Sequence, residues 1–342
     1  MKKVGIIGHF AFGKNKLNGQ TVKTLAVAKI LTDAFGEDAV LCKDTCGGAM
    51  SLLRIFKDAK ELCRGCEHKI VMLAQNGLKH LVPVLYRANG KSGEKMHLIA
   101  IGGWLPEYLV ENHKIAEKIR EFSGVYVETE EMEAKLRRMG FKNIILLPNF
   151  KPFEKRVENV KNFISEPVRL CTFSRVTAEK GIREAMLAVQ LANRKGKRKY
   201  ELCVYGQVDK SFEKDFFELL VDDNSISYGG EIAYDACVHT LKSFDGLLFP
   251  TYYAGEGLAG TILDAFSAGL AVIASDFKYN RQYIEHGRNG LLVPPNDAAK
   301  LADAIVELYE ERDVIEMRNA SLRFADRFGA KRAAEILLEK II

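Results

Sequence analysis

The sequence predicts an α/β protein built from two domains in tandem, and three observations support this fold class. Apolar runs of strand length alternate with amphipathic helical segments through most of the chain, as in βα units with parallel sheets. The length of 342 residues is enough for two domains with separate cores. A charged segment with two prolines, residues 149–167, separates two such alternating series.

The first series contains six predicted strands, which are short apolar runs bounded by polar or glycine residues. They lie at residues 3–8, 38–42, 69–74, 96–101, 124–128 and 143–147. Helical segments fill most of the gaps, among them residues 20–34 and 129–139. This series predicts an N-terminal domain over residues 1–150.

The second series starts at "VRLCTFS" and continues through "YELCVYG", "SISYGG", "GLLFPT" and "AVIAS". It predicts a linker at residues 151–166 and a C-terminal domain at 167–324. A helical tail at 298–342 ends the sequence, and we expect its last part, 325–342, to pack back on the N-terminal domain. Ligands of open α/β sheets bind beyond the carboxyl ends of the strands, so the loops after the strands are where chemistry is expected.

Composition is that of an ordinary globular protein, with 47% hydrophobic and 28% charged residues. No run of eighteen uncharged apolar residues and no signal-peptide pattern occurs, which predicts a cytoplasmic location. Residues 1–150 hold 23 Lys and Arg against 16 Asp and Glu, a net charge of +7, whereas the whole chain has +5. This bias suits anionic lipid headgroups or phosphorylated substrates, although a plain solubility surface is the simpler interpretation.

The seven cysteines do not favour a disulfide framework, because their number is odd and the chain has no secretory signal. The spacing of Cys42, Cys46, Cys63 and Cys66 resembles that of a zinc ribbon. Cys42 ends a strand-like run, however, while Cys63 lies in a helix-like segment. Ordinary thiols are therefore the preferred interpretation, and zinc stays an alternative.

The stretch "GHFAFGKN", residues 8–15, has the spacing of a phosphate-binding P-loop. Gly8, Gly13 and Lys14 stand where that motif has its glycines and lysine. The next position is Asn15 instead of Ser or Thr, and its amide is a poorer ligand for magnesium than a hydroxyl. The stretch alone leaves open whether a nucleotide triphosphate binds here.

The most informative stretch is "FPTYYAGEGLAGTILDAFSAGLAVIASD", residues 249–276. A glycine-rich turn carries Glu256, and a helix that begins near Ala259 carries Asp264 about one turn later. Gly257 allows a ligand close to the backbone, and the helix start offers a phosphate seat. The N–H groups of that seat are those of Leu258, Ala259 and Gly260. Two carboxylates beside a phosphate seat suit a nucleotide sugar, with its hydroxyls on both sides of a diphosphate; helix capping is the alternative.

Glu256-x₇-Asp264, with the following "AFSAGLAVIASD" and "IEHGRNGLLVPPND", resembles the E-x₇-E region of retaining glycosyltransferases of family 4, the group 1 transferases. The resemblance is strong over residues 168–310. It implies the GT-B fold, in which two Rossmann-like domains face each other across a cleft. It also implies a nucleotide diphosphate sugar as donor and no required metal or other cofactor. Glu256 would hold the sugar, and Asp264, shorter than the family's Glu by about one C–C bond (~1.5 Å), the ribose.

A second family feature is "FSRVTAEKGIREAM", residues 173–186. It resembles the family's strand-loop-helix in which an Arg and a Lys, here Arg175 and Lys180, grip the donor diphosphate. Two cations between a strand and a helix start suit a diphosphate, with charge-assisted hydrogen bonds worth about 1.5–3 kcal/mol each. A solvated basic loop is the alternative. Arg175, Lys180 and Glu256 are thus the predicted catalytic residues.

Three further donor contacts follow from the resemblance. Gly206 in "VYGQV" would lie under the nucleotide, and the backbone near Ile232 in "YGGEI" would meet the base. Gly19 in "LNGQT", at the mouth of the first helix, would let the diphosphate sit against the opposite wall.

Residues 9–19 are expected to form a long first loop that shapes the acceptor side, with His9, Lys14 and Lys16 as candidates. Many family members have a histidine in the stretch where this chain reads "LIAIGGWLPEYL". This chain has none at Gly102 or Gly103, so no catalytic histidine is assigned there. We expect a glycan or lipid-linked acceptor, as in bacterial surface polysaccharide assembly, with peripheral contact to an anionic membrane at the inner face of the cell membrane. No nucleic-acid partner is expected.

Other function classes remain open. A nucleotide-sugar epimerase or a phosphorylase of similar architecture is one alternative, and a non-catalytic nucleotide-sugar-binding or scaffold protein is another. A dinucleotide-dependent oxidoreductase is disfavoured, because no G-x-G-x-x-G follows a predicted strand.

Overall fold

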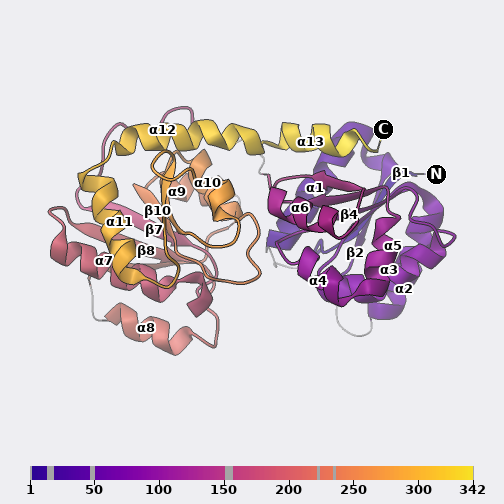
Figure 1. The fold of residues 1–342 in the computed structure, drawn as a ribbon, viewed down its shortest axis with the longest axis horizontal. Helices are drawn as coiled ribbons and strands as arrows, with labels where there is room; N and C mark the ends of the chain where they lie inside the picture. The colour runs from indigo at the N-terminus through magenta and orange to yellow at the C-terminus, as the bar shows by residue number, and fades with distance from the viewer. Residues whose placement is uncertain are drawn as a thin grey trace. The chain divides into compact units, whose positions relative to one another are not determined.

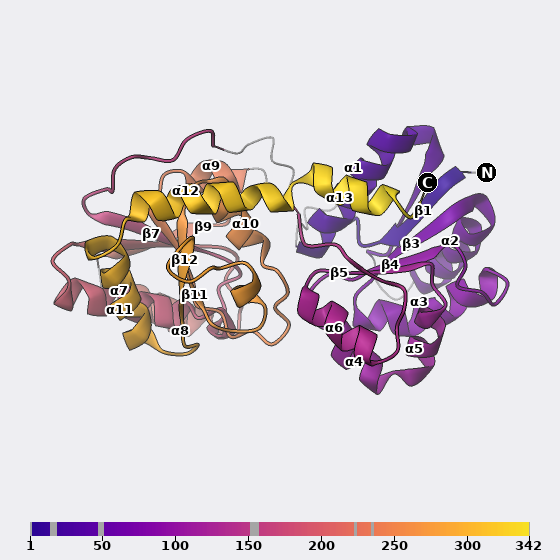
Figure 2. The ribbon, with the colours of Figure 1, turned by 45° about the horizontal axis from the view of Figure 1, so that its top comes forward.

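The computed structural model describes residues 2–13, 19–46, 51–150, 157–221, 224–233 and 236–341. The chain divides into two compact units. Unit 1 comprises Met1–Phe150 and Ala330–Ile342, and unit 2 comprises Lys151–Gly329. Each unit has a six-stranded parallel sheet flanked by helices (Figures 1 and 2).

The sheet of unit 1 has the strand order β2-β1-β3-β4-β5-β6. Its strands are β1 (Lys2–Gly8), β2 (Val40–Asp44), β3 (Cys66–Met72), β4 (Met96–Ile99), β5 (Gly124–Val127) and β6 (Ile144–Leu146). Its helices are α1 (Gly19–Phe35), α2 (Ser51–Gly65), α3 (Gln75–Ala88), α4 (Leu105–Glu111), α5 (His113–Arg120), α6 (Glu130–Arg138) and α13 (Ala330–Leu338). All six strands predicted for residues 1–150 are present.

Burial explains why the strands of unit 1 read as continuous apolar runs, since a parallel sheet covered on both faces exposes neither. Ile6 and Ile7 are successive residues of β1, and their exposed fractions are 0% and 1%. One core cluster joins β1 to α1 and to α13, whose Ala333 and Leu337 are buried in it. The end of the chain therefore packs within unit 1, against α1 (Figure 1).

The sheet of unit 2 has the strand order β12-β11-β10-β7-β8-β9. Its strands are β7 (Val168–Phe173), β8 (Tyr200–Tyr205), β9 (Ile226–Gly230), β10 (Gly246–Phe249), β11 (Ala271–Ser275) and β12 (Gly290–Val293). Its helices are α7 (Ile182–Lys195), α8 (Glu213–Val221), α9 (Cys237–Leu241), α10 (Gly260–Ser267), α11 (Ala298–Glu310) and α12 (Val314–Ala325). The five predicted strands are present, but β12 was not predicted because its four residues lie between a glycine-rich turn and two prolines.

A buried ion pair anchors α12 to the amino-terminal edge of this sheet. The Arg318 guanidinium donates to the Asp245 carboxylate over 2.8 Å, and both side chains are at most 1% exposed. Asp245 directly precedes β10 and also accepts the backbone N–H of Arg169 and of Ser165. Arg318 donates further to the carbonyl of Phe163, so one pair fixes α12 and the segment before β7 together.

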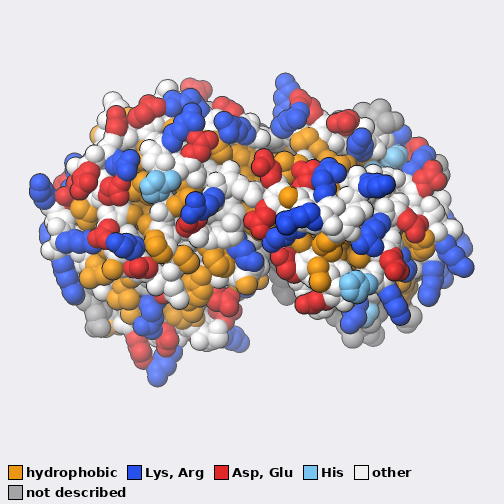
Figure 3. Space-filling view, viewed as in Figure 1, with side chains coloured by type: hydrophobic (Ala, Val, Ile, Leu, Met, Phe, Trp, Pro, Cys, Tyr) orange, Lys and Arg blue, Asp and Glu red, His pale blue; other side chains and the backbone are white. Residues whose placement is uncertain are grey.

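Basic and acidic side chains alternate over the visible face of both units (Figure 3). On unit 1, for example, Lys135 pairs with both Glu107 and Glu131. Among the helices that the structure describes, none has the length and apolar character needed to cross a membrane.

Candidate functional site

The strand order of unit 2 marks one place where a ligand site is expected. The chain runs outward from β7 through β8 to β9, then returns to the other side of β7 and runs outward through β10, β11 and β12. The order reverses between β7 and β10. Crevices at such switch points, beyond the carboxyl ends of the strands, are where open α/β sheets bind ligands. Arg175 and Lys180 follow β7, and Glu256 follows β10.

The centre of this site is an ion pair between Lys180 and Glu256. The Lys180 Nζ lies 2.5 Å from Glu256 Oε2, and both side chains are 11% exposed. The Thr251 hydroxyl lies 3.0 Å from the same carboxylate oxygen. Lys180 ends the short 3₁₀ turn Ala178–Lys180, whereas Glu256 lies 76 positions later, so the fold brings them together.

Both cations of the site lie near the ring of Tyr253. The Lys180 Nζ lies 4.9 Å from the centre of this ring, and the Arg175 guanidinium carbon lies 6.0 Å from it. Arg175 is exposed, while Lys180 is largely covered. Neither Thr251 nor Tyr253 was singled out from the sequence, although both belong to the stretch "FPTYYAGEG".

Two glycines let the loops of the site approach each other closely. Gly181 has φ +71°, and a Cβ there would lie 2.2 Å from the Pro250 carbonyl oxygen. Gly206 has φ +135°, and a Cβ there would lie 1.7 Å from the Ser174 carbonyl oxygen. Any larger residue at either position would force the loops after β7, β8 and β10 apart.

The helix that follows Glu256 begins at Gly260, with Ala259 as its N-cap. No side chain caps this helix start, and Ala259 is 9% exposed. The Thr261 hydroxyl donates to the Phe173 carbonyl over 2.8 Å, which fixes the helix start beside the end of β7. Asp264 lies one turn into the helix and is also 9% exposed. Helix N-termini attract anions through their N–H groups and dipole, so the start of α10 can seat a phosphate.

Each of the two cations of the site lies near a carboxylate of the chain: Lys180 near Glu256, and Arg175 near Asp209. Lys180 carries three N–H donors, so it can hold Glu256 and still donate to a phosphate. Asp209, after β8, lies near enough to Arg175 to interact with it electrostatically. The pKa of Asp209 lies below its usual value because the Ser211 hydroxyl and amide donate to it, with Arg175 adding a smaller effect.

The other predicted site residues lie on both units. Gly206 directly follows β8, Gly257 and Leu258 are buried between Glu256 and α10, and Ile232 is partly exposed after β9. In unit 1, Gly19 opens α1 and His9 follows directly on β1, partly exposed. Lys14 and Lys16 lie outside the described residues. The roles of all these residues in binding stay predictions.

The loop after β1 answers the question that its P-loop spacing raised. The Asp44 carboxylate, at the end of β2, accepts the backbone N–H groups of Phe10, Ala11 and Phe12 over 2.9–3.2 Å, and that of Cys46 over 2.8 Å. Burial alone would raise the pKa of Asp44, but these four N–H donors outweigh it and hold the pKa below its usual value. Three N–H groups of the P-loop-like stretch therefore bind a carboxylate of the protein itself, while Lys14 and Asn15 lie outside the described residues.

The four cysteines with zinc-ribbon spacing lie in different elements. Cys42 is in β2 and Cys46 follows it, whereas Cys63 is near the end of α2 and Cys66 begins β3. None of these four takes part in a disulfide, and burial raises the pKa of Cys63 to about 11. Within the ranges that the structure describes, no three His, Cys, Asp or Glu side chains gather as metal ligands would.

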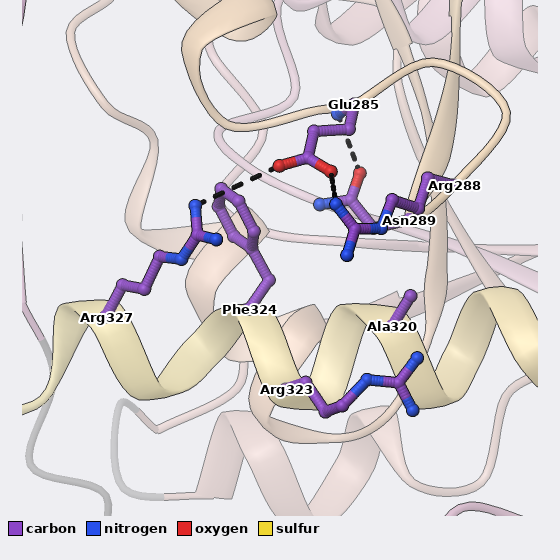
Figure 4. Close-up of a pocket in the computed structure, with 7 residues that line it drawn as sticks. All are labelled: Glu285, Arg288, Asn289, Ala320, Arg323, Phe324 and Arg327. Carbon is purple, nitrogen blue, oxygen red and sulfur yellow. Dashed lines mark hydrogen bonds and ion pairs between the residues drawn. The ribbon is translucent and has the colours of Figure 1, made fainter.

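A separate small cavity lies at the opposite edge of the unit 2 sheet, before the amino end of β12 (Figure 4). Its volume is about 120 Å³. Glu285 pairs there with Arg288 over 2.5 Å and with Arg327 over 3.9 Å, and Arg327 covers the ring of Phe324. One carboxylate thus faces two guanidinium groups, which leaves the cavity with an excess of positive charge, and the cavity is not part of the site beside β7 and β10.

Comparisons with known proteins agree on one family and one fold. Residues 154–325 match the model of the family described as Glycosyl transferases group 1. The amylovoran biosynthesis glycosyltransferase AmsK of Erwinia amylovora is 25% identical over 195 residues, which are 54% of this chain and 48% of that protein. The chain spans about half the length of the first curated relatives it matches.

Solved structures match over nearly the whole chain. Anabaena HepE, solved in complex with UDP-glucose, has a TM-score of 0.76 at 15% identity and covers 99% of this chain and 98% of its own. The sucrose-phosphate synthase of Thermosynechococcus elongatus has a TM-score of 0.75 at 15% identity, with the same coverage. These likenesses confirm the predicted α/β fold of the GT-B type, with two parallel sheets.

Proposed function

The chain belongs to the glycosyl transferases group 1, and from this premise we propose that it transfers a sugar from a nucleotide diphosphate donor with retention of anomeric configuration. The observation that carries the proposal is the group formed by Lys180, Glu256 and Arg175 around Tyr253. It lies at the switch point between β7 and β10, where a ligand is expected on topological grounds alone.

In this proposal the two cations bind the donor diphosphate and neutralise the charge that develops on it as the sugar departs. Lys180 uses its donors that Glu256 leaves free, and the N–H groups at the start of α10 supply further donors. Glu256, held by Lys180 and Thr251, accepts hydrogen bonds from hydroxyl groups of the donor sugar. Asp264 accepts those of the ribose.

Proton transfer then needs no strong protein base. The departing diphosphate takes the proton of the acceptor hydroxyl on the face that it leaves, which is consistent with retention. The chain's residues therefore act by charge stabilisation and by holding the reactants in position. We expect no requirement for a metal ion, since Arg175 and Lys180 supply positive charge at the diphosphate, and activity in excess EDTA tests this.

The comparisons suggest where to begin with substrates. HepE was solved with UDP-glucose, and a GtfA subunit of Streptococcus agalactiae, 28% identical over 167 residues, is named for UDP-N-acetylglucosamine. UDP-glucose and UDP-N-acetylglucosamine are therefore the first donors to test. AmsK is named for amylovoran biosynthesis, and we propose a glycan or lipid-linked acceptor in surface polysaccharide synthesis. We place the reaction in the cytoplasm, at the inner face of the cell membrane.

The proposal predicts that Lys180→Ala or Arg175→Ala lowers sugar transfer by about two orders of magnitude or more, because each removes a cation from the leaving diphosphate. Transfer of labelled sugar, with thermal unfolding measured beside it, checks this. Lys214→Ala is a matched control, because Lys214 is a solvent-exposed lysine of α8 in the same unit, with its side chain 86% exposed. Wild-type transfer in both site variants would refute the assignment, and sugar conversion without any acceptor would point to an epimerase.

A further inference from the structure

The loop after β1 presents an aromatic ring at the carboxyl edge of the unit 1 sheet. Phe12 is 55% exposed, although it follows β1 by only four residues. An exposed phenylalanine on a mobile loop would need no explanation, since scattered apolar residues are normal on surfaces. Phe12 differs because both its backbone and its ring are fixed.

The backbone of Phe12 is held by Asp44. Its N–H donates to Asp44 Oδ2 over 3.0 Å, while the N–H groups of Phe10 and Ala11 donate to Oδ1. Ala11 takes a positive φ of 54°, which turns the three successive N–H groups toward one carboxylate.

The ring of Phe12 is held by Phe10. The two ring centres are 4.9 Å apart and the ring planes are inclined by 15°, so the rings are stacked. Phe10 is 3% exposed and belongs to the core of unit 1. One face of Phe12 therefore lies against the core, and its exposed area is available to a ligand.

We propose that Phe12 is the platform on which a sugar ring of the acceptor stacks, an inference that rests on the proposed function. The C–H face of a pyranose is flat and apolar, and it removes apolar area of the phenyl ring from water without leaving a hydroxyl unpaired. Its hydroxyls project sideways from the ring edge, away from the phenyl face. A preformed platform also costs little conformational entropy on binding.

The surroundings favour a sugar over a lipid surface. Membrane insertion needs several apolar side chains on one face. The described part of unit 1 has four exposed large hydrophobic residues, and they come from separate elements: Phe12, Leu25, Phe56 and Val110. A single ring, held against Phe10, instead matches the one flat apolar face of a sugar.

Three variants of the full chain test this. Phe12→Ala removes the ring, Phe12→Trp keeps a flat ring, and Phe12→Leu keeps an apolar side chain that is not flat. Phe163→Ala is the control, because Phe163 is 58% exposed but belongs to unit 2. The probes are octyl glycosides of glucose, galactose, mannose and N-acetylglucosamine, followed by saturation-transfer NMR, which separates ring protons from chain protons. UDP and vesicles of anionic phosphatidylglycerol are the two further probes.

We expect the wild type to transfer saturation to the sugar-ring protons of at least one glycoside. Affinity should fall about tenfold in Phe12→Ala and Phe12→Leu and be retained in Phe12→Trp and Phe163→Ala. UDP affinity should be unchanged throughout. Unchanged glycoside binding in Phe12→Ala, or no glycoside bound by the wild type, would overturn the platform. So would a variant effect confined to octyl-chain protons or vesicles, which would indicate a lipid contact. If the wild type does not bind UDP, this result would instead contradict the proposed function.

Discussion

Among the residues that the structure describes, each unit has one ion pair whose two side chains are at most 2% exposed, and the two pairs differ in where they lie on their sheets. In unit 2, Arg318 and Asp245 meet at the amino edge, just before β10. In unit 1, Lys23 of α1 lies 2.6 Å from Glu128, which directly follows β5 at the carboxyl edge, and both side chains are 2% exposed. The two pairs have similar chemistry and burial at opposite edges.

Their remaining hydrogen bonds show what each pair fixes. Asp245 and Arg318 bind backbone groups at the start of β7 and in the segment before it, away from the proposed ligand side. Glu128 instead accepts the N–H of Gly102 over 3.2 Å, in the loop after β4, where φ is +86°. The unit 1 pair thus joins the start of α1 to the loops that follow β4 and β5 at the carboxyl edge. Because the two pairs are equally buried, only their position on the sheet suggests a different role, and we predict that the unit 1 pair supports the ligand side.

The largest expected effect in this comparison is on stability, from Asp245→Ala. It leaves the Arg318 guanidinium buried without its carboxylate and removes the acceptor of two backbone N–H groups. We expect the free energy of unfolding to fall by about 3–5 kcal/mol. Urea unfolding followed by circular dichroism measures this. A loss under about 1 kcal/mol would show that the pair is not the anchor of α12.

A smaller stability effect, combined with a loss of transfer, is expected for Lys23→Met. The methionine fills the space of the lysine stem, and Glu128 keeps the Gly102 N–H, so we expect a loss of about 2–3 kcal/mol. The double variant Lys23→Met/Glu128→Gln should recover part of it, because no unpaired buried charge remains. Measuring sugar-transfer activity, at a temperature where every variant is folded, tests the difference between the two ion pairs further. The activity should fall in Lys23→Met and stay near wild type in Asp245→Asn; equal activities would remove the functional distinction.

Mild acid should distinguish the units further, through a histidine pair buried in the unit 1 sheet. His68 Nδ1 of β3 lies 3.0 Å from His97 Nε2 of β4, and His97 is 0% exposed. Burial lowers the pKa of His97 to about 3, with His68 and Lys69 adding to the shift, and burial also lowers the pKa of His68. Unfolded histidine titrates near 6.5, so below that pH the unfolded state binds more protons than the folded state.

The stability of unit 1 should therefore be complete above about pH 6.5 and fall between pH 6.5 and 3, by up to about 1.4 kcal/mol per pH unit for His97. The histidines of unit 2, His239 and His286, are exposed. Hydrogen exchange at pH 7 and pH 5 should show protection lost first in β3 and β4, and His97→Gln should reduce this pH dependence. Equal loss of protection in both sheets would contradict it.

Much of the fold could be predicted because it is encoded locally. Strands buried on both faces have continuous apolar sequences, and all the predicted strands are present in the structure. The strand β12 was missed because four residues beside prolines give too short a pattern. Lys180 and Glu256 were found from family motifs. Their direct pairing was not, and neither were Thr251, Tyr253 or the contact of Asp44 with Phe10. Asp44 lies 34 positions from Phe10, and no local pattern indicates that its carboxylate fills the loop.

The contact of Asp44 with the first loop has a consequence for any search that begins from sequence motifs. A run of backbone N–H groups is a site for an anion only while no anion of the chain already occupies it. In this loop the Asp44 carboxylate is the counter-ion of the N–H groups of residues 10–12. A stretch can thus have the spacing of a phosphate-binding loop while some of its N–H groups bind a carboxylate of the chain itself.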